Sequence, residues 1–373
     1  MRYPSIDILR TFAIFVMVLV HFGENLSGFH SPLTGFGAPL FAFLSGVSYR
    51  LWANGQAARG KSPEEISKVS VRRGLFVFGV GFAFNILVWL PEDTFNWDVL
   101  TFVGAALLLL NFARRIPLPV CVLLAVFAVL ASPLLQSMAD YGAYWENTYF
   151  ECDLTLSDVL IGFLVTGYFP IFPWIAFSLA GLVTSAVLFG EDRVPATGKV
   201  AKGDIGGPNA SAWPTVLLGV ALIGVALGGL AVRSRLPAVV AEKLLGGWSM
   251  FPPTLEYVTC TLGICLALVG LGHCYVDCNP RALRHDGPLD IAKTFSRYSF
   301  TIYVLHHFAH LWPLWLYGIA TGNEPTEFWM KAMPMAVSIP LALVFLVICY
   351  WILRRLGPDR TYGIESWMRW LCD

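Results

Sequence analysis

Long apolar runs are the feature that most restricts the fold of this 373-residue chain. Ten runs are long enough to cross a membrane as helices, at approximately residues 6–23, 34–52, 74–91, 98–113, 117–136, 168–189, 213–232, 257–275, 297–319 and 333–353. About 20 predominantly apolar residues match the hydrocarbon core of a bilayer. A chain that is 56% apolar and 13% charged, with a mean hydropathy of +0.64, does not fit a soluble domain. We therefore predict an all-α fold, a polytopic integral membrane helical bundle of about ten transmembrane helices.

The distribution of Lys and Arg predicts the orientation of this bundle. Cytoplasmic loops of membrane proteins carry an excess of these residues. If the N-terminus is cytoplasmic, every Lys and Arg falls on the cytoplasmic side except Arg233, Arg235, Lys243 and Lys331. One span too many or too few would destroy this bias, so it supports the count of ten. The N-terminus and the C-terminus are then both cytoplasmic.

The chain is predicted to form a single transmembrane domain over residues 1–373. Spans one to six lie in 1–189, a Gly-, Pro- and Asn-containing cytoplasmic linker in 190–212, and spans seven to ten with the tail in 213–373. The eight Cys are scattered, which does not favour a disulfide framework. The N-terminus lacks a cleavage site, so we expect the first span to be retained. The net charge of zero gives no reason to expect nucleic-acid binding.

The first span carries two ionisable residues, Arg10 and His21. Ionisable residues within a span are costly and are functional candidates. Eleven residues at about 100° each place both side chains on one helix face, roughly 16 Å apart along the axis. A cation near one surface can thus hold an anionic group while a base works deeper. Alternatively, Arg10 reaches the lipid phosphates and His21 is a hydrogen-bonded interior residue.

Polar residues follow at the outer end of this span: Glu24, Asn25 and His30. Histidine is the usual general base for an attacking amine or hydroxyl. We therefore take His21, His30, Glu24 and Asn25 as candidate catalytic residues, with Glu24 or Asn25 fixing the tautomer of the base. Alone, His30 would be read as a solvated loop residue.

Arginines cluster at the predicted cytoplasmic ends of several spans. Arg10, Arg72, Arg73 and Arg297 are candidate ligands for phosphate groups, because guanidinium pairs well with phosphate oxygens. Membrane topology alone explains most of them, but not Arg10, which lies about a turn inside its span. Small residues of the second span, from Gly35 to Ser48, favour close helix packing.

Two other groups of residues are ambiguous. Residues 137–167 contain aromatic and acidic side chains but no Lys or Arg, which suits a sugar or amine acceptor and equally an aromatic belt at the membrane interface. The pair His306 and His310 shares a helix face, and His273 lies near Cys278 and His285, yet neither set has a complete metal-ligand pattern. We predict no metal site.

Several motifs resemble the transmembrane acyltransferase superfamily, in the branch of heparan-α-glucosaminide N-acetyltransferase-like proteins. The arginine and the histidine separated by ten residues in Ser5–Phe22 resemble the opening of the superfamily. Further similar segments are Ala38–Gly46, Gly167–Trp174, Phe251–Tyr257 and Arg297–His306, and the tail Tyr362–Arg369 is similar to the end of a related branch. The resemblance covers essentially the whole chain. Two departures stand out: His21 replaces the asparagine of the lysosomal branch at the end of span one, and Thr11 replaces the usual glycine.

The resemblance implies an integral membrane acyltransferase that modifies glycans of the cell envelope. It implies a location in the inner membrane of a bacterium. Such an enzyme takes an acetyl (acyl) group from cytoplasmic acetyl-CoA and passes it to a hydroxyl or amino group of an extracytoplasmic sugar. His30 matches the active-site loop histidine of the lysosomal branch. The resemblance also permits a homodimer. We expect the arginines to hold the CoA phosphates while His21 or His30 deprotonates the acceptor; direct transfer and an acyl-histidine intermediate stay open.

Two other classes of function were weighed. A secondary transporter or flippase would use the same intramembrane polar path without chemistry. A structural or signalling membrane protein would leave the aligned Arg10 and His21 unexplained.

Overall fold

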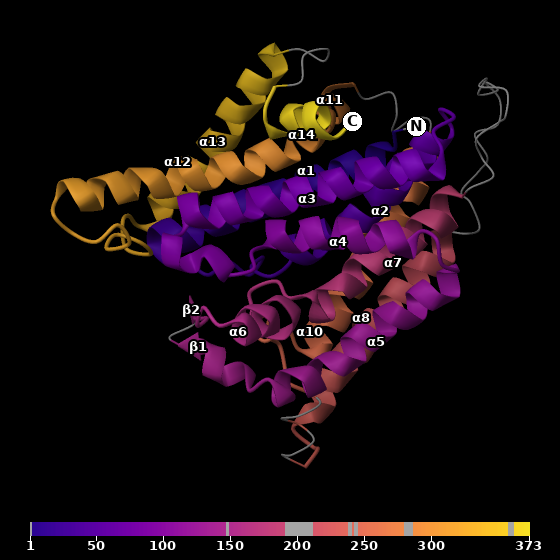
Figure 1. Ribbon diagram of the computed structural model, residues 1–373, viewed down its shortest axis with the longest axis horizontal. Helices are drawn as coiled ribbons and strands as arrows, with labels where there is room; N and C mark the ends of the chain where they lie inside the picture. Colours follow the sequence, from indigo (N-terminus) through magenta and orange to yellow (C-terminus); the bar gives the residue numbers. More distant parts are fainter. Residues whose placement is uncertain are drawn as a thin grey trace. The chain divides into compact units, whose positions relative to one another are not determined.

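The computed structural model describes residues 2–146, 149–190, 212–237, 241, 245–279, 286–356 and 362–373, and these residues are mostly helical (Figure 1). Nearly all of the predicted linker 190–212 lies outside the described residues. The chain forms two compact units: Met1–Ser5, Pro39–Ala282 and Cys372 make the first, and Ile6–Ala38, Leu283–Leu371 and Asp373 make the second. The first span therefore groups with the last helices of the chain.

Each of the ten predicted spans coincides with a helix. These helices are α1 (Pro4–Ser27), α2 (Gly37–Ala57), α3 (Pro63–Val88), α4 (Val99–Ala113), α5 (Leu118–Met138), α7 (Ile171–Phe189), α8 (Ala212–Arg233), α10 (Leu255–Gly272), α12 (Ser299–Ala320) and α13 (Met335–Arg355). The prediction placed the start of α3 too late. Its first turns are polar and are stabilised by a capping box, in which Ser62 and Glu65 bond each other's backbone N–H.

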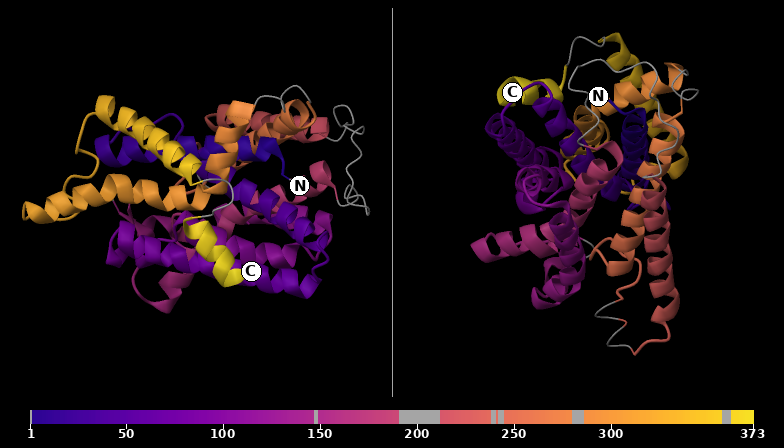
Figure 2. Two further views of the ribbon diagram at one scale, coloured as in Figure 1. Left: turned by 90° about the horizontal axis from the view of Figure 1, so that it is seen from above. Right: turned by 90° about the vertical axis from the view of Figure 1, so that its right-hand side faces the viewer.

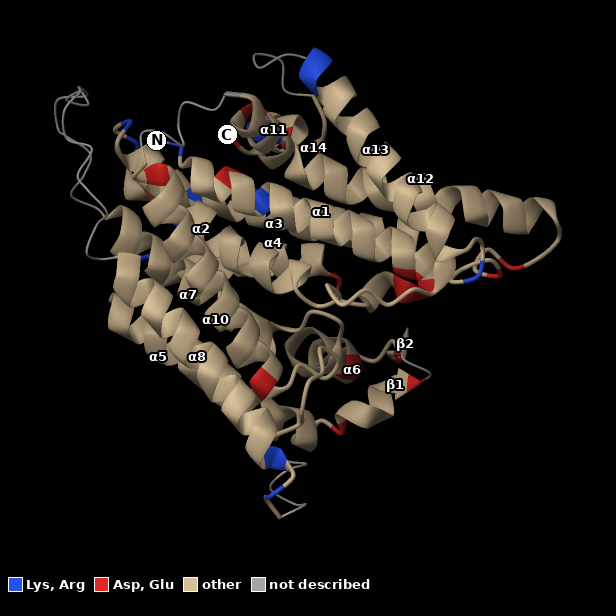
Figure 3. Ribbon diagram, turned by 180° about the vertical axis from the view of Figure 1, so that it is seen from behind, with Lys and Arg blue, Asp and Glu red and all other residues tan. Residues whose placement is uncertain are grey.

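Among the described residues, eight helical segments have the length and composition needed to cross a membrane. The other two predicted spans, α2 with 21 residues and α12 with 22 residues, are long enough at about 1.5 Å per residue but are more polar. The fold is thus that of an all-α, multi-pass integral membrane protein. Helices such as α5 and α8 have long stretches without Lys, Arg, Asp or Glu (Figure 3).

In the first unit, helices pack in pairs: α3 on α4, α5 on α7, and α8 on α10. Helix α2 packs against α7 through glycines, because a methyl group built on Gly46 would overlap the backbone oxygen of Ser178, and one on Gly181 would overlap that of Phe43. The close packing predicted for the second span is therefore confirmed. The described part of this unit ends with the π-helix η4 (His273–Asp277) after α10.

The described part of segment 137–167 contains the short helices η2 (Tyr141–Tyr144), α6 (Leu156–Ile161) and η3 (Gly162–Thr166), and the strands β1 (Trp145–Glu146) and β2 (Tyr149–Phe150). Another short helix, η1 (Pro91–Phe95), lies between α3 and α4. The strands pair antiparallel, with Trp145 opposite Phe150. The Trp145 ring stacks on Tyr141 at 5.5 Å and on Phe251 at 5.3 Å between centroids. These aromatic rings pack on one another; a role in sugar binding stays a prediction.

The second unit consists of α1, α11 (Asp286–Arg297), α12, α13 and α14 (Ile364–Cys372). Helix α13 turns back at a wide angle to α12, and the two are joined at one end by the segment 321–334 (Figure 2). That segment is bonded to the end of α1, because the N–H groups of Met330 and Met333 donate to the carbonyls of Asn25 and Leu26. Ser27 of α1 also bonds Ser338 of α13, at 3.0 Å between hydroxyls. The outer turn of α1 is thus held from two sides.

Candidate active site

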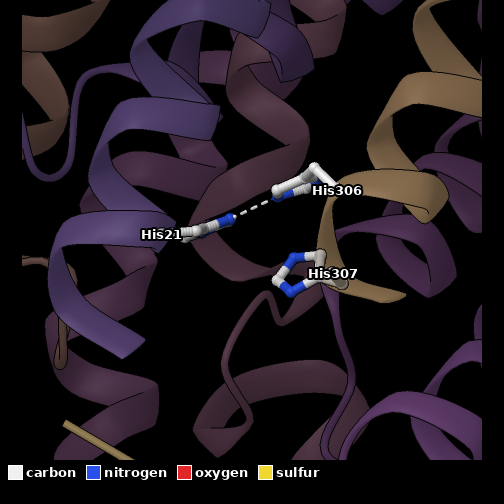
Figure 4. Close-up of side chains that lie close together, drawn as sticks. All are labelled: His21, His306 and His307. Carbon is white, nitrogen blue, oxygen red and sulfur yellow. Dashed lines mark hydrogen bonds between the residues drawn. The ribbon is translucent and has the colours of Figure 1, made fainter. Parts of the chain in front are cut away.

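Two pairs of side chains join α1 to α12 in the second unit. His21 Nδ1 lies 2.9 Å from His306 Nε2, and Asn25 Nδ2 lies 2.9 Å from His310 Nε2 (Figure 4 shows the first pair). Both pairs are spaced four residues apart on their helix, so each helix presents one face to the other. We call His21, Asn25, His306 and His310 the histidine ladder.

Backbone carbonyls fix the tautomers in the ladder when its histidines are neutral. His306 Nδ1 lies 3.1 Å from the Ile302 carbonyl oxygen, which can only accept, so Nδ1 carries the hydrogen. His306 Nε2 is then an acceptor, and His21 must donate to it from Nδ1. The consequence is that His21 Nε2 carries the lone pair. A neutral imidazole held this way is a general base.

The second rung of the ladder follows the same logic. His310 Nδ1 donates to the His306 carbonyl at 2.5 Å, which leaves His310 Nε2 to accept from the Asn25 amide N–H. The rotamer of Asn25 is thereby set, with its nitrogen toward α12. An amide has a second N–H and an oxygen, so Asn25 can also bond a substrate.

His307 brings a third imidazole beside the first rung. Its ring centroid lies 4.7 Å from that of His21 and 4.0 Å from that of His306 (Figure 4). Ligand nitrogens of the three residues all lie within 4.8 Å of one another. No third ligand was predicted for the pair His306 and His310; the structure instead groups His306 with His307 and with His21 of α1.

The three histidines of α12 are removed from water. His306 and His307 are fully buried and His310 is 2% exposed, while His21 and Asn25 of α1 are partly exposed. The Phe22 ring packs against His310 and Phe345, with centroids 4.7 and 5.6 Å apart. Polar groups in such surroundings need hydrogen-bond partners, and the ladder provides them.

The outer loop candidates take other partners. Glu24 accepts from the Thr34 hydroxyl at 2.8 Å and lies 3.4 Å from His30 Nδ1, whose side chain is 72% exposed. His21 Nδ1 faces His306 rather than Glu24 or Asn25, so the expectation that one of these two residues fixes the tautomer of the base stays a prediction for His30 alone. His30 and Glu24 instead form a loose pair at the surface.

Arg10 lies at the other end of α1. Its guanidinium donates to the Ser296 hydroxyl at 3.3 Å, and Ser296 donates to the Asp7 carboxylate at 2.6 Å. Arg10 and His21 therefore both face the α11–α12 segment, which confirms the prediction that they share a helix face. Arg297 directly follows Ser296 in the sequence, and its role as a phosphate ligand stays a prediction.

The remaining two arginines, Arg72 and Arg73, belong to α3 in the first unit. Arg72 is exposed, and Arg73 lies over the Trp52 ring at 4.7 Å from its centroid. In the same unit His273 Nδ1 lies 3.1 Å from Asp277, which also accepts from the Ser5 N–H and hydroxyl. This group ties the N-terminus to η4, and His285, the remaining member of the predicted set, lies outside the described residues.

Sequence reasoning missed His306 and His310 as partners of the first span. The sequence does contain two polar pairs with the same four-residue spacing, one on each of two apolar helices. Periodicity shows which residues share a face, but it does not show which helix that face meets.

Comparison with known protein families identifies one match to this chain. The sequence model of the family described as heparan-alpha-glucosaminide N-acetyltransferase, catalytic, matches residues 2–205, more than half of the chain. The matched part contains Arg10, His21 and Asn25, whereas α12 lies beyond it. No curated protein matches the chain. The chain belongs to the family of the heparan-alpha-glucosaminide N-acetyltransferase catalytic domain.

Proposed function

We propose that this membrane protein transfers an acetyl group from cytoplasmic acetyl-CoA to a hydroxyl or amino group of an extracytoplasmic sugar. The observation that carries the proposal is His21, held by His306 in the tautomer that leaves Nε2 able to accept a proton. It lies on the first span, within the part of the chain that matches an acetyltransferase family.

The proposed chemistry is acyl transfer with general-base catalysis. His21 Nε2 removes the proton from the acceptor as it attacks the thioester carbonyl, and the imidazolium that forms returns a proton to the leaving thiolate. His306 stabilises the imidazolium by accepting its Nδ1 hydrogen. Such a base contributes about 10²- to 10⁴-fold to the rate.

Asn25 is proposed to act beside the base. Its amide is oriented by His310 and sits one helical turn beyond His21. The second N–H can donate to the thioester oxygen as negative charge develops there. Donors held in place before the reaction stabilise such an oxyanion without reorganisation.

The inner end of α1 is proposed to hold the donor. CoA is elongated, with phosphates at one end and the thioester at the other. Arg10 and Arg297 suit its phosphates, and His21 lies roughly 16 Å farther along the helix axis. Arg72 and Arg73 stay proposed phosphate ligands on sequence grounds.

His30 is proposed to act in acceptor binding, and one observation supports this role. The His30 imidazole lies beside the Glu24 carboxylate, which can orient it. The pair is exposed and the bond is long at 3.4 Å, so we assign it to acceptor binding and the base role to His21.

The sugar is proposed to belong to a bacterial cell envelope and the protein to the inner membrane, where a homodimer is compatible with the family. The test is transfer of radiolabelled acetyl from acetyl-CoA by the purified protein in proteoliposomes. Amino sugars and hydroxyl-bearing glycans serve as acceptors. An enzyme consumes acetyl-CoA and labels the acceptor. A transporter or flippase would leave acetyl-CoA intact while moving the sugar, and that result would overturn the proposal.

A further inference from the structure

We propose that His21, His306 and His307 form a binding site for a zinc-class divalent ion, and that this ion inhibits the transfer reaction. Binding is independent of the proposed function, whereas inhibition rests on it. Among the described residues, this is the one group of three His, Cys, Asp or Glu side chains close enough to hold a metal ion.

The three imidazoles fit a zinc site in number and kind. Zinc binds imidazole nitrogen at about 2.0–2.1 Å and is often held by three protein ligands with water in the fourth position. The ligand nitrogens already lie within 4.8 Å of one another, and those of His21 and His306 lie 2.9 Å apart. On binding, the three rings would turn their ligand nitrogens toward the ion.

A supporting hydrogen bond is also in place. Histidines that bind metals commonly donate their other ring N–H to a carbonyl or carboxylate, which fixes the tautomer and the ring. His306 makes this bond from Nδ1 to the Ile302 carbonyl, so its Nε2 lone pair points toward His21. The absence of thiolate and carboxylate from the triad favours ions that accept imidazole, such as zinc, cobalt and nickel.

Inhibition follows from the single lone pair of a neutral imidazole. In the ladder, His21 carries its proton on Nδ1 and its lone pair on Nε2. When a metal ion takes Nδ1, that proton moves to Nε2, which can no longer accept one from the acceptor. No proton is gained or lost overall, and release of the ion restores the base. The ion and the acceptor therefore compete for the same electron pair.

Cobalt(II) is the probe for binding, because its absorption reports coordination by nitrogen. The purified protein, without a polyhistidine tag and without acetyl-CoA, is titrated with cobalt(II) and then with zinc(II). We expect one cobalt ion per chain, displaced by zinc. His307→Gln removes one ligand and weakens binding by more than about tenfold. The matched controls His30→Gln and His273→Gln, which change histidines outside the triad, retain it.

Two results would overturn the binding site: no cobalt spectrum in the wild type, or equal affinity in His307→Gln. The inhibitory role is tested by acetyl transfer with and without zinc at a concentration that saturates the site. Unchanged transfer by the zinc-loaded protein would overturn that role. A wild type without any transfer activity would instead overturn the proposed function and leave the binding result intact.

Discussion

At the scale of single residues, the base of the proposed reaction depends on a neighbour 285 residues away in sequence. We predict that His306→Leu lowers kcat by about 10²-fold, because His21 is no longer held with Nδ1 protonated. The KM for acetyl-CoA should stay near the wild-type value. His306→Gln should recover part of the rate, since its amide oxygen can accept the same N–H. Steady-state kinetics of the three proteins test this; equal rates for Leu and Gln would show a purely structural role.

Arg10 is expected to act on donor binding rather than on the chemical step. Arg10→Ala should raise the KM for acetyl-CoA by roughly 10- to 100-fold, the range expected for a lost charge-assisted hydrogen bond of about 1.5–3 kcal/mol. The kcat should change little, because the interaction is the same in the ground state and the transition state. Arg10→Lys should have a KM between the values of the wild type and Arg10→Ala. A loss of kcat at unchanged KM would contradict the assignment.

At the scale of elements, the start of α12 is fixed by the C-terminal helix α14. The Glu365 carboxylate accepts from the N–H groups of Phe300 and Thr301 at 2.8 and 3.0 Å and from the Thr301 hydroxyl. These N–H groups have no partner within a helix, so the carboxylate takes the place of a capping residue. The C-terminal tail thus helps to position the helix that carries His306.

This contact predicts a dependence of stability on pH. Burial raises the pKa of Glu365, against the effect of its hydrogen bonds with Thr301 and Phe300. The folded protein therefore holds this proton more tightly than the unfolded chain. Stability should fall as pH rises from about 4.3, the ordinary Glu value, through the raised pKa, and then level off.

Thermal unfolding in detergent across this pH range tests the contact. The advantage of the wild type over Glu365→Gln should shrink as pH rises, since glutamine does not titrate. Glu365→Ala should cost about 1–3 kcal/mol by leaving buried groups unsatisfied. The control Glu327→Gln removes only an exposed pair with Lys331 and should leave the profile unchanged. A wild-type advantage that grows with pH would contradict the argument.

The sequence predicts some helices better than others. The apolar length of residues 6–23 predicted α1 closely, because a span must match the bilayer. The helices α11 and α14 were not predicted, since they are short and amphipathic and their stability comes from tertiary contacts such as that of Glu365. Arg10 and His21 were assigned to one face correctly, but the face they meet could not be read from local spacing.

At the scale of the whole molecule, the distribution of Lys and Arg predicts the orientation of the protein in the membrane. We predict that residues at the two ends of α13 lie on opposite sides of the membrane. In a background without the eight native cysteines, Asn323→Cys should react with an impermeant thiol reagent added outside intact cells. Tyr362→Cys, which is also exposed, should react only after the cells are opened. The reverse pattern would place the C-terminus outside and contradict the topology.

The most direct test of the central claim is acetyl-CoA turnover by the purified protein in detergent, for wild type, His21→Ala and His30→Ala. The account predicts that the wild type consumes acetyl-CoA, that His21→Ala loses at least about 10²-fold in rate while still binding the donor, and that His30→Ala keeps most of the rate. If His21→Ala retained the wild-type rate while His30→Ala lost it, the base would be the exposed loop histidine, and the assignment of the histidine ladder to catalysis would be wrong.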